Sequence, residues 1–315
     1  METEQTNFDV IVVGAGISGI GAGHHLQEQC PNKSFVILEG RETFGGTWDL
    51  FRYPGIRSDS DMHTMGFRFK PWVDERFIAD GPSIIEYLDE TISENNLKDK
   101  IRYRHKVITS SWSSSESKWT LEVENSSSGT TDKYKCNFLM LCGGYYNYEE
   151  GHNPDFKNQD QFDGPIIHPQ KWPQDLDYKN KKVVIIGSGA TAVTIVPAMA
   201  DQVDHITMLQ RSPTYFMAAP DKDMIGNFLK KIFRQKTAYF LTRWKNILMG
   251  NFFYNRCVKN PEKVKEMLIN GVKDHLGEDY DIDTHFTPKY KPWDERLCFV
   301  PNADLFEAMK AGKAS

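Results

Sequence analysis

The sequence predicts an α/β fold with two dinucleotide-binding, Rossmann-like domains and a helical insertion in the second domain. Two glycine-rich turns, each placed between an apolar β-branched run and a helical stretch, predict the two domains, and basic amphipathic segments after Pro220 predict the insertion. A chain of 315 residues is long enough for two cores. We expect a first nucleotide domain over 1–145, a linker over 146–180 and a second domain over 181–315, with its insertion at about 221–290.

The composition is that of an ordinary globular protein, with 39% hydrophobic and 26% charged residues. A net charge of −5 gives no reason to expect nucleic acid. The polar, acidic N-terminus has no signal-peptide core, and no apolar run is long enough for a membrane span. Five scattered cysteines without a metal-like pair favour reduced thiols in the cytoplasm and no metal site.

The first glycine-rich turn follows the short apolar strand expected at 9–13. Gly14, Gly16 and Gly19 have the GxGxxG spacing that allows a tight turn, backbone contact with a pyrophosphate and close helix packing. The next strand, at 34–38, ends at Glu39, which is placed to accept hydrogen bonds from ribose hydroxyls. A helix cap with coincidental glycines is the alternative, but the strands and the acid in register favour nucleotide binding.

The second glycine-rich turn, Gly187 to Ala192, lies between a strand at 182–186 and a helix that runs to about Asp201. The following strand, at 205–209, ends in Gln-Arg-Ser where an acid would sit for NAD. Arg211 beside Ser212 suits a ribose with a 2′-phosphate, which favours NADP. A solvated surface arginine is the alternative.

Further motifs give the chain a family resemblance. The linker carries FxGxxxHxxxWP from Phe162 to Pro173, and further motifs lie at 51–62 and 292–297. With these motifs the chain resembles, over its whole length, the type I Baeyer–Villiger monooxygenases, and among them the ethionamide-activating branch. The resemblance implies FAD, NADPH and O2, with oxygen inserted beside the carbonyl of a small ketone, and thioethers as further substrates. Trp172-Pro173 favours this group over the related nitrogen and sulfur oxygenases, which remain an alternative.

The resemblance also implies binding roles for individual residues. The Gly45-Gly46 doublet taken alone is an ordinary turn, but in such flavoproteins it lets the backbone pass close to the flavin diphosphate. The implied FAD contacts are Gly14, Gly16, Ser18, Gly19, Glu39, Gly46, Thr47, Trp48, Asp49, Leu50, Asp59 and Val107. The implied NADP contacts are Arg57, Ser58 and Asp59 at the nicotinamide, and Gly187, Ser188, Gly189, Ala190, Thr191, Ala192, Arg211 and Ser212 at the phosphates.

Arg296 falls at the position of the family's active-site arginine. A fixed cation stabilises the negative charge that develops as oxygen adds to the carbonyl, and arginine suits this because it does not deprotonate. The resemblance makes Asp59 the residue that positions this guanidinium. Without the resemblance, Arg296 in its Asp-Glu-Arg cluster would be a surface residue. His168 is expected to be structural, without a proton-transfer role, and Trp172 is equally compatible with a packing role.

Two regions leave alternatives open. The stretch 228–249 has apolar residues at helical spacing and a basic opposite face, which fits a packed insertion helix and also weak association with a membrane surface. Relative to the family, the chain lacks a C-terminal segment, so both domains are expected to be incomplete and to expose apolar edges. An inactive chain that binds nucleotide or a partner is therefore a second alternative. A dithiol reductase is disfavoured because no cysteine pair follows the Gly-Gly turn. The oligomeric state stays open.

Overall fold

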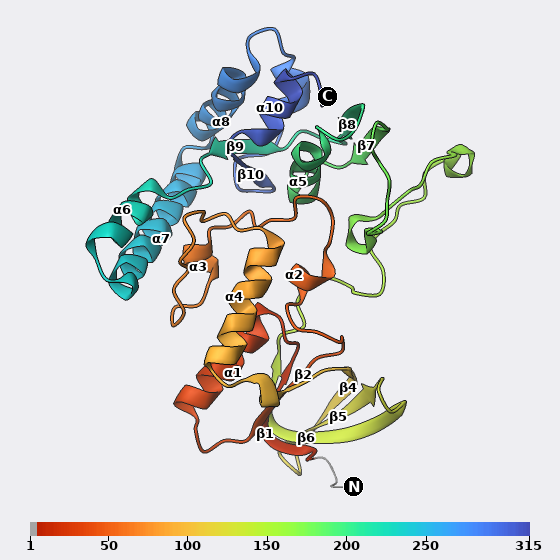
Figure 1. Cartoon of the computed structure of the whole chain (residues 1–315), viewed down its shortest axis with the longest axis vertical. Helices are drawn as coiled ribbons and strands as arrows, with labels where there is room; N and C mark the ends of the chain where they lie inside the picture. The colour runs from red at the N-terminus through yellow and green to blue at the C-terminus, as the bar shows by residue number, and fades with distance from the viewer. Residues whose placement is uncertain (1–4) are drawn as a thin grey trace. The chain divides into compact units, whose positions relative to one another are not determined.

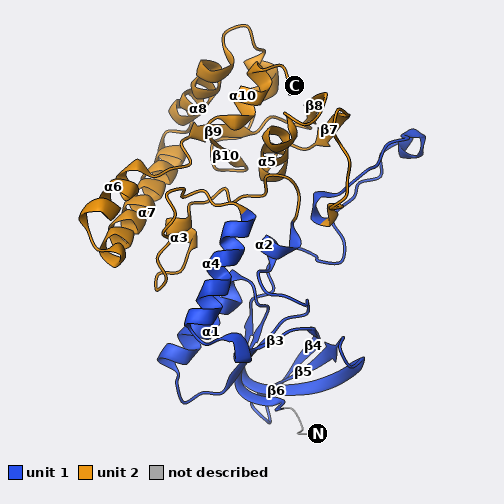
Figure 2. Cartoon of the chain, viewed as in Figure 1, with its two compact units in different colours: residues 1–51, 81–170 blue, residues 52–80, 171–315 orange. Residues whose placement is uncertain are grey.

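The computed structural model describes residues 5–315, which form two compact units (Figures 1 and 2). Unit 1 contains residues 1–51 and 81–170, and unit 2 contains residues 52–80 and 171–315. The fold is mixed α/β, as predicted. Residues 52–80, expected within the first domain, belong to unit 2, and the expected linker at 146–180 is divided between the two units after residue 170.

Unit 1 is built on a six-stranded sheet in the order β3-β2-β1-β6-β5-β4, in which β1, β2, β3 and β6 are parallel and β4, β5 and β6 form an antiparallel meander. The elements are β1 (Asn7–Val13), α1 (Ile17–Gln29), β2 (Phe35–Leu38), α2 (Thr47–Leu50), α4 (Gly81–Glu94), β3 (Ile101–Arg102), β4 (His105–Ser113), β5 (Lys118–Asn125) and β6 (Thr130–Leu141).

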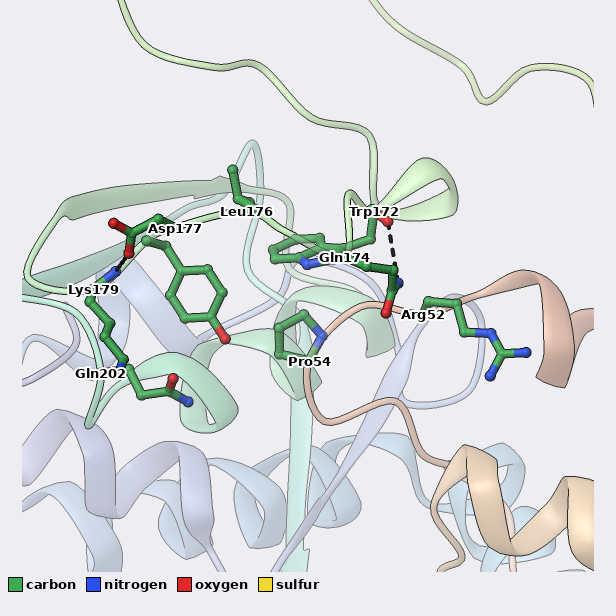
Figure 3. Close-up of a pocket in the computed structure, with 9 residues that line it drawn as sticks. Arg52, Pro54, Trp172, Gln174, Leu176, Asp177, Lys179 and Gln202 are labelled. Carbon is green, nitrogen blue, oxygen red and sulfur yellow. Dashed lines mark hydrogen bonds between the residues drawn. The ribbon is translucent and has the colours of Figure 1, made fainter.

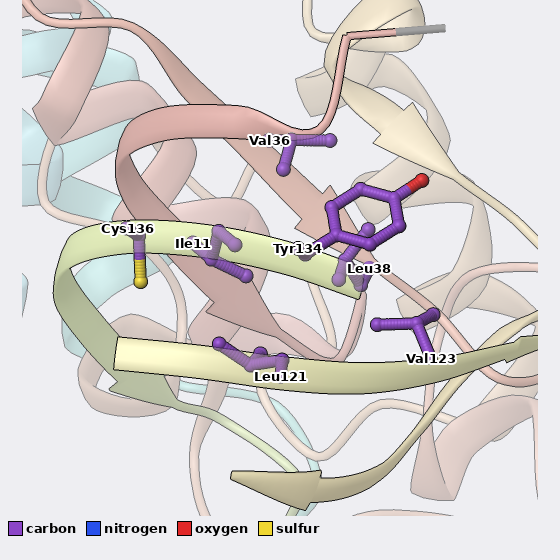
Figure 4. Packing of buried hydrophobic residues seen from close by; sticks show 7 residues of the cluster. All are labelled: Ile11, Val36, Leu38, Leu121, Val123, Tyr134 and Cys136. Atoms are coloured by element: carbon purple, nitrogen blue, oxygen red, sulfur yellow. The ribbon is translucent and has the colours of Figure 1, made fainter. Parts of the chain in front are cut away.

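The core of unit 1 lies between the parallel strands and the meander (Figure 4). Side chains from β1, β2, β5 and β6 meet there with almost no exposure to solvent. Each such aliphatic side chain stabilises the fold by about 1.5–3 kcal/mol. The cluster consists of Ile11, Val36, Leu38, Leu121, Val123, Tyr134 and Cys136. This core holds the carboxyl ends of β1 and β2 in place, where the first glycine-rich turn begins.

Unit 2 contains two parallel strand pairs, β7-β8 and β9-β10, together with most of the helices. Helix α8 packs against β9 around Tyr215, Cys257, Val264 and Leu268. The elements are α3 (Met62–Met65), β7 (Lys182–Ile186), α5 (Ala190–Met199), β8 (His205–Leu209), β9 (Tyr215–Ala219), α6 (Met224–Ile232), α7 (Gln235–Lys259), α8 (Pro261–Leu276), α9 (Ile282–Phe286), β10 (Leu297–Pro301) and α10 (Asp304–Lys310).

The segment 52–80 is joined to the rest of unit 2 by backbone and side-chain hydrogen bonds. Phe77 N donates to Asp221 O over 2.8 Å, and the Tyr239 hydroxyl donates to Phe67 O over 2.9 Å. Gly55 approaches α5 so closely that a Cβ there would lie 2.6 Å from Cβ of Ala198. These contacts explain why the segment belongs to unit 2 although it lies early in the sequence.

The strand pair β7-β8 exposes apolar side chains. Val184 and Ile186 on β7 are 60% exposed. Beside β8, residues 313–315 run parallel to the strand, and Ser315 N donates to Ile206 O over 3.0 Å. Among residues 5–315, no helix is long and apolar enough to cross a membrane.

Candidate functional site

Two backbone turns meet at the carboxyl end of β1, and both depend on glycine. Gly14 has φ +101°, and a Cβ on it would lie 2.6 Å from Cys142 O. A Cβ on Gly19 would lie 1.8 Å from Gly14 O, so the start of α1 can approach the turn only without a side chain. Gly46 of the second turn has φ +55°, and a Cβ on it would lie only 3.2 Å from Gly16 Cα. The two turns, at Gly14–Gly19 and Gly45–Gly46, thus bring backbone together without intervening side chains, and we call them the glycine cradle.

Glu39 ties this cradle to the end of β2. Its carboxylate is 6% exposed; Ala15 N donates to Oε2 over 2.8 Å and Arg41 N donates to Oε1 over 2.9 Å. Each carboxylate oxygen has a further lone pair. The acid therefore orders the glycine-rich turn and retains acceptor capacity for a hydroxyl group.

Arg41 is part of this region and was missed from the sequence. Its Nη2 lies 2.6 Å from Oδ2 of Asp49, which is 8% exposed, and its guanidinium lies 5.8 Å from the ring centre of Tyr148. Burial, with the charge of Glu39, raises the pKa of Tyr148. The spacing of Arg41 two residues after the acid is the only sequence signal that could have drawn attention to it.

Apart from Asp59, which belongs to unit 2, the other FAD residues implied by the resemblance lie on α1, α2 and β4 of unit 1. Ser18 is exposed in the first turn of α1, and Thr47, Trp48 and Leu50 form α2 together with Asp49. Val107 lies on β4, where the register with β5 shifts. His105 N donates to Glu39 O over 2.8 Å, which places the beginning of β4 beside the acid.

His168 has a structural environment. Gln170 N donates to its Nδ1 over 3.2 Å, and a Cβ on Gly151 would lie 2.2 Å from its Cε1. The buried Gln170 in turn donates from Nε2 to Asn147 O over 2.5 Å. The histidine thus orders the linker within unit 1, in agreement with the expected structural role.

The second glycine-rich turn connects β7 to α5 in unit 2. Gly187 has φ +137° and donates from its N–H to Leu209 O over 2.8 Å, and Gly189 precedes the first residue of α5. The buried Ser188 hydroxyl lies 3.0 Å from Thr214 Oγ1 and donates to Ser212 O over 3.3 Å. The N-terminal turn of α5, with Ala190, Thr191 and Ala192, therefore presents N–H groups beside the end of β8.

Arg211 and Ser212 lie two and three residues after the end of β8 and are exposed. The hydrogen bond from Ser188 to Ser212 O holds this segment against the glycine-rich turn. A guanidinium at this position faces solvent, as phosphate recognition requires. The structure thus holds the segment that carries Arg211 beside the second turn, and the phosphate-binding role of Arg211 stays a prediction.

Arg296 also lies at the second turn. A Cβ on Gly189 would be 3.5 Å from Nη1 of Arg296, and the Tyr290 hydroxyl donates to Arg296 O over 2.8 Å. Burial raises the pKa of the Cys298 thiol to about 11; Asp59 raises it further and Arg296 lowers it. Both charges therefore lie near Cys298, a residue that sequence reasoning missed because β10 reads only as an apolar strand.

The segment 57–59 is held within unit 2 by an ion pair and by hydrogen bonds. The guanidinium of Arg57 binds Asp304 at the start of α10, with 2.5 Å between Nη1 and Oδ2. Ser58 is buried, and its hydroxyl donates to Ser60 O over 2.7 Å. Asp59 is exposed and accepts from the Ser60 hydroxyl over 3.3 Å. Arg57 is thus anchored within unit 2, and Asp304 is a partner that the sequence did not reveal.

A cavity of about 300 Å³ in unit 2 is lined by Trp172 of the linker motif (Figure 3). The rings of Trp172 and Tyr178 have centroids 6.3 Å apart. Arg52 and Pro54 from the early segment, Gln202 after α5 and further residues between 174 and 179 also line it. Trp172 and the segment 52–54 thus border the same cavity, and a packing role of Trp172 stays a prediction.

The described residues contain no cluster of His, Cys, Asp and Glu that could hold a metal ion. All five cysteines are free thiols in the structure. The polar groups at the two glycine-rich turns therefore consist of backbone N–H groups, carboxylates and guanidinium groups, a set suited to nucleotide phosphates and riboses.

Comparison with known proteins identifies the family. The model of the pyridine nucleotide-disulphide oxidoreductase family matches residues 11–251, more than half of the chain. The chain belongs to this family. It is 53% identical over 308 residues to the FAD-containing monooxygenase EthA of Mycobacterium tuberculosis, covering 98% of this chain and 63% of that protein. It is 51% identical over 312 residues to the probable FAD-binding monooxygenase AlmA of Acinetobacter sp., covering 99% of this chain and 62% of that protein.

Solved structures show the same fold. An oxidized steroid monooxygenase bound to NADP superimposes with a TM-score of 0.80 at 22% identity, covering 98% of this chain and 64% of that one. Cyclohexanone monooxygenase from Rhodococcus sp. Phi1 bound to NADP+ superimposes with a TM-score of 0.78 at 19% identity, covering 99% and 64%. The predicted resemblance of the chain to FAD monooxygenases of the Baeyer–Villiger type is confirmed. The chain spans less than two thirds of the length of these relatives.

Proposed function

We propose that this chain is an FAD- and NADPH-dependent monooxygenase that inserts oxygen beside a ketone carbonyl. The observation that carries the proposal is the presence, in one chain, of a glycine cradle with its acid and of a second glycine-rich turn next to Arg296. The likeness to FAD-containing monooxygenases supports the same chemistry. A chain with two nucleotide sites is suited to a reaction that uses two redox cofactors.

The residues of unit 1 fit FAD. At Gly14, Gly16 and Gly46 a Cβ would fill the space next to the backbone, and this bare backbone suits the diphosphate. Glu39 would accept from a ribose hydroxyl, and Arg41 would add positive charge near the phosphates. Bound FAD supplies the activation of O2 that no side chain of the protein can perform.

The residues of unit 2 fit NADPH. The N-terminal N–H groups of α5 would bind the pyrophosphate, while Arg211 and Ser212 would bind the 2′-phosphate. Under this proposal residues 1–145 and 181–315 correspond to the two nucleotide domains, and α6 to α9 form the insertion between β9 and β10. Arg57, Ser58 and Asp59 would border the nicotinamide, with Arg57 held in place by Asp304.

Arg296 is the residue to which we assign the stabilisation of negative charge. Its guanidinium stays protonated, so it can offset charge that develops on the carbonyl oxygen as the new C–O bond forms. Asp59 would orient that guanidinium, as the family resemblance implies, and the charges of both residues act on the Cys298 thiol. Burial raises the pKa of the Cys298 thiol, so the thiol stays neutral and does not form an ion pair with Arg296.

The first experiment asks whether the chain holds flavin and consumes NADPH. The purified protein should be yellow and should consume NADPH faster when an aliphatic ketone is added, with the ester detected by gas chromatography. Sulfoxide formation from a thioether without ester formation would instead identify a heteroatom oxygenase. Absence of both flavin binding and NADPH consumption would favour a chain that binds nucleotide or a partner without turnover.

Arg296→Ala separates the two half-reactions. We expect reduction of the flavin by NADPH to remain, while ester formation falls about a hundredfold to a thousandfold, the usual cost of removing such a donor. Lys291→Ala, a charge removal at an exposed position of the same loop, is the matched control and should leave both rates unchanged. Ester formation at the original rate in Arg296→Ala would remove Arg296 from the reaction.

A further inference from the structure

Helices α6 and α7 of unit 2 carry large apolar side chains that face solvent. On α7, Phe240, Trp244, Leu248 and Phe252 follow one another at every fourth residue, and they are 49% to 65% exposed. Positions four apart lie on one side of a helix, so these side chains form a continuous stripe. Exposed apolar patches of this kind usually mark an interaction surface.

The neighbouring helix α6 also exposes large apolar side chains. Met224, Ile225, Phe228 and Ile232 are 57% to 77% exposed, and their spacing places them on one side of this helix too. The two helices pack against each other and are adjacent in Figure 1. Their buried sides are occupied by other contacts: the Asp223 carboxylate caps α6 at Gly226 N and binds Lys245 Nζ over 2.6 Å. The exposed apolar sides are therefore not needed to hold the pair together.

The charge of this region has one sign. Residues 224–259 contain eight Lys or Arg and no Asp or Glu, although the whole chain has a net charge of −5. Some of these cations have structural roles: Arg243 donates to His63 O and Gly66 O, and Lys230 donates to Asp74 O. Others are exposed, and these are Lys231, Arg234, Lys236, Arg256 and Lys259. An apolar stripe with a basic border is the pattern of helices that bind anionic lipid surfaces.

A cavity of about 370 Å³ opens on the same surface, between α7 and residues 68–71. Phe240 and Trp244 belong both to the apolar stripe and to this cavity, and Arg68, Lys236 and Arg243 supply three cations to its lining. Aromatic walls and several guanidinium or ammonium donors suit a phosphate group that carries an apolar chain. The cavity and the stripe can thus be occupied by parts of the same molecule.

We infer that the surface formed by α6 and α7 docks onto a bilayer that contains anionic lipids, and that the cavity beside Trp244 receives a lipid phosphate. The excess of cations on α6 and α7 argues against a symmetric pair of chains on this surface, because most of these cations would face a like-charged partner. The same charge matches an anionic headgroup layer, while Phe and Trp side chains are suited to the region just below the headgroups. The inference does not depend on the proposed oxidation.

Vesicle co-sedimentation of the whole chain tests this inference. We expect binding to vesicles of equal parts phosphatidylcholine and phosphatidylglycerol, little binding to phosphatidylcholine alone, and weaker binding at high salt. Removal of the two exposed cavity cations in Arg68→Gln/Lys236→Gln should weaken binding by about fivefold for each charge. The charge control is Lys133→Gln/Lys157→Gln, at two exposed lysines of unit 1, which should bind like the original chain.

The apolar stripe is tested by Phe240→Ser/Trp244→Ser/Leu248→Ser, which should abolish vesicle binding without loss of helical circular dichroism. Its control is Ile108→Ser/Trp112→Ser, at two exposed apolar positions of β4. Light scattering after size exclusion reports the oligomeric state of each variant. The inference is overturned if anionic vesicles do not bind, if the stripe variant binds like its control, or if the original chain is a dimer that the stripe substitutions dissociate. Equal competition by free inorganic phosphate would also overturn it, because the site would then recognise phosphate without lipid.

Discussion

Buried His63 should make the stability of unit 2 depend on pH. The side chain is 1% exposed, and within the described residues its Nδ1 has no hydrogen-bond partner. Burial, assisted by the charge of Lys230, lowers its pKa from 6.5 to about 4, although the carboxylates of Asp61 and Asp223 oppose the shift. The folded protein therefore holds His63 neutral where the unfolded chain would protonate it.

The sign and size follow from this difference. Since the folded pKa lies below the unfolded value, the unfolded chain binds more protons between pH 6.5 and about 4, and stability falls as the pH drops through that window. At about pH 5 the free energy of unfolding should be roughly 2 kcal/mol lower than at neutral pH, from this residue alone. Below the folded pKa the loss should reach about 3 kcal/mol.

Urea unfolding at neutral pH and at about pH 5, followed by circular dichroism, measures this contribution. His63→Phe keeps a ring beside Tyr239, whose ring centre lies 5.9 Å away, but removes the titrating group. We expect its stability to change less between the two pH values, by roughly 2 kcal/mol, than that of the original chain. His152→Gln, at an exposed histidine, should show the original pH dependence. An equal pH dependence in His63→Phe would refute the reasoning.

Three further substitutions test the nucleotide sites. Glu39→Gln should lower the free energy of unfolding by about 1–3 kcal/mol in urea titrations, because a buried backbone N–H would face an amide donor. Its control is Glu42→Gln, at a surface ion pair, which should change the free energy of unfolding almost not at all. Equal effects of the two substitutions would contradict the role of the buried carboxylate. Gly19→Ala should abolish FAD retention, measured by absorbance after gel filtration, because the added Cβ would overlap backbone atoms. The control Gly271→Ala, where no atom lies within 4 Å of the added Cβ, should retain FAD and be stabilised by about 0.5–1 kcal/mol. Arg211→Ala should shift the preference in flavin reduction rate from NADPH toward NADH, and an unchanged preference would remove Arg211 from the phosphate site.

Local patterns in the sequence predicted much of both glycine-rich units. The strands at 182–186 and 205–209 have the predicted bounds, because each is a short β-branched run that ends at a turn signal. The turns themselves follow from glycines at positions where the backbone has a positive φ or lies too close to other atoms for a Cβ. Such features are encoded by neighbouring residues, so a single sequence reveals them.

Interactions between distant residues were not predictable in the same way. The pairs Arg57–Asp304 and Arg41–Asp49 depend on where the folded chain places their side chains, and no periodicity marks them. Assignment of residues 52–80 to unit 2 depends on hydrogen bonds to residues such as Asp221 and Tyr239. The exposed stripe on α7 was recognised as amphipathic, but only the structure shows that its apolar side faces solvent.

The assignment of residues 52–80 to unit 2 also constrains how the protein can be synthesised. During translation this segment leaves the ribosome before most of unit 1 and long before residue 171, where the remainder of unit 2 begins. Side chains that end up buried, such as Met62 and Ile78, must therefore stay in water while the sheet of unit 1 is completed. Contacts between residues so far apart in sequence form slowly, and exposed apolar segments attract chaperones or other nascent chains in the meantime. A change in translation speed downstream of residue 80 should therefore alter the expression yield, even where the stability of the two folded units is unchanged.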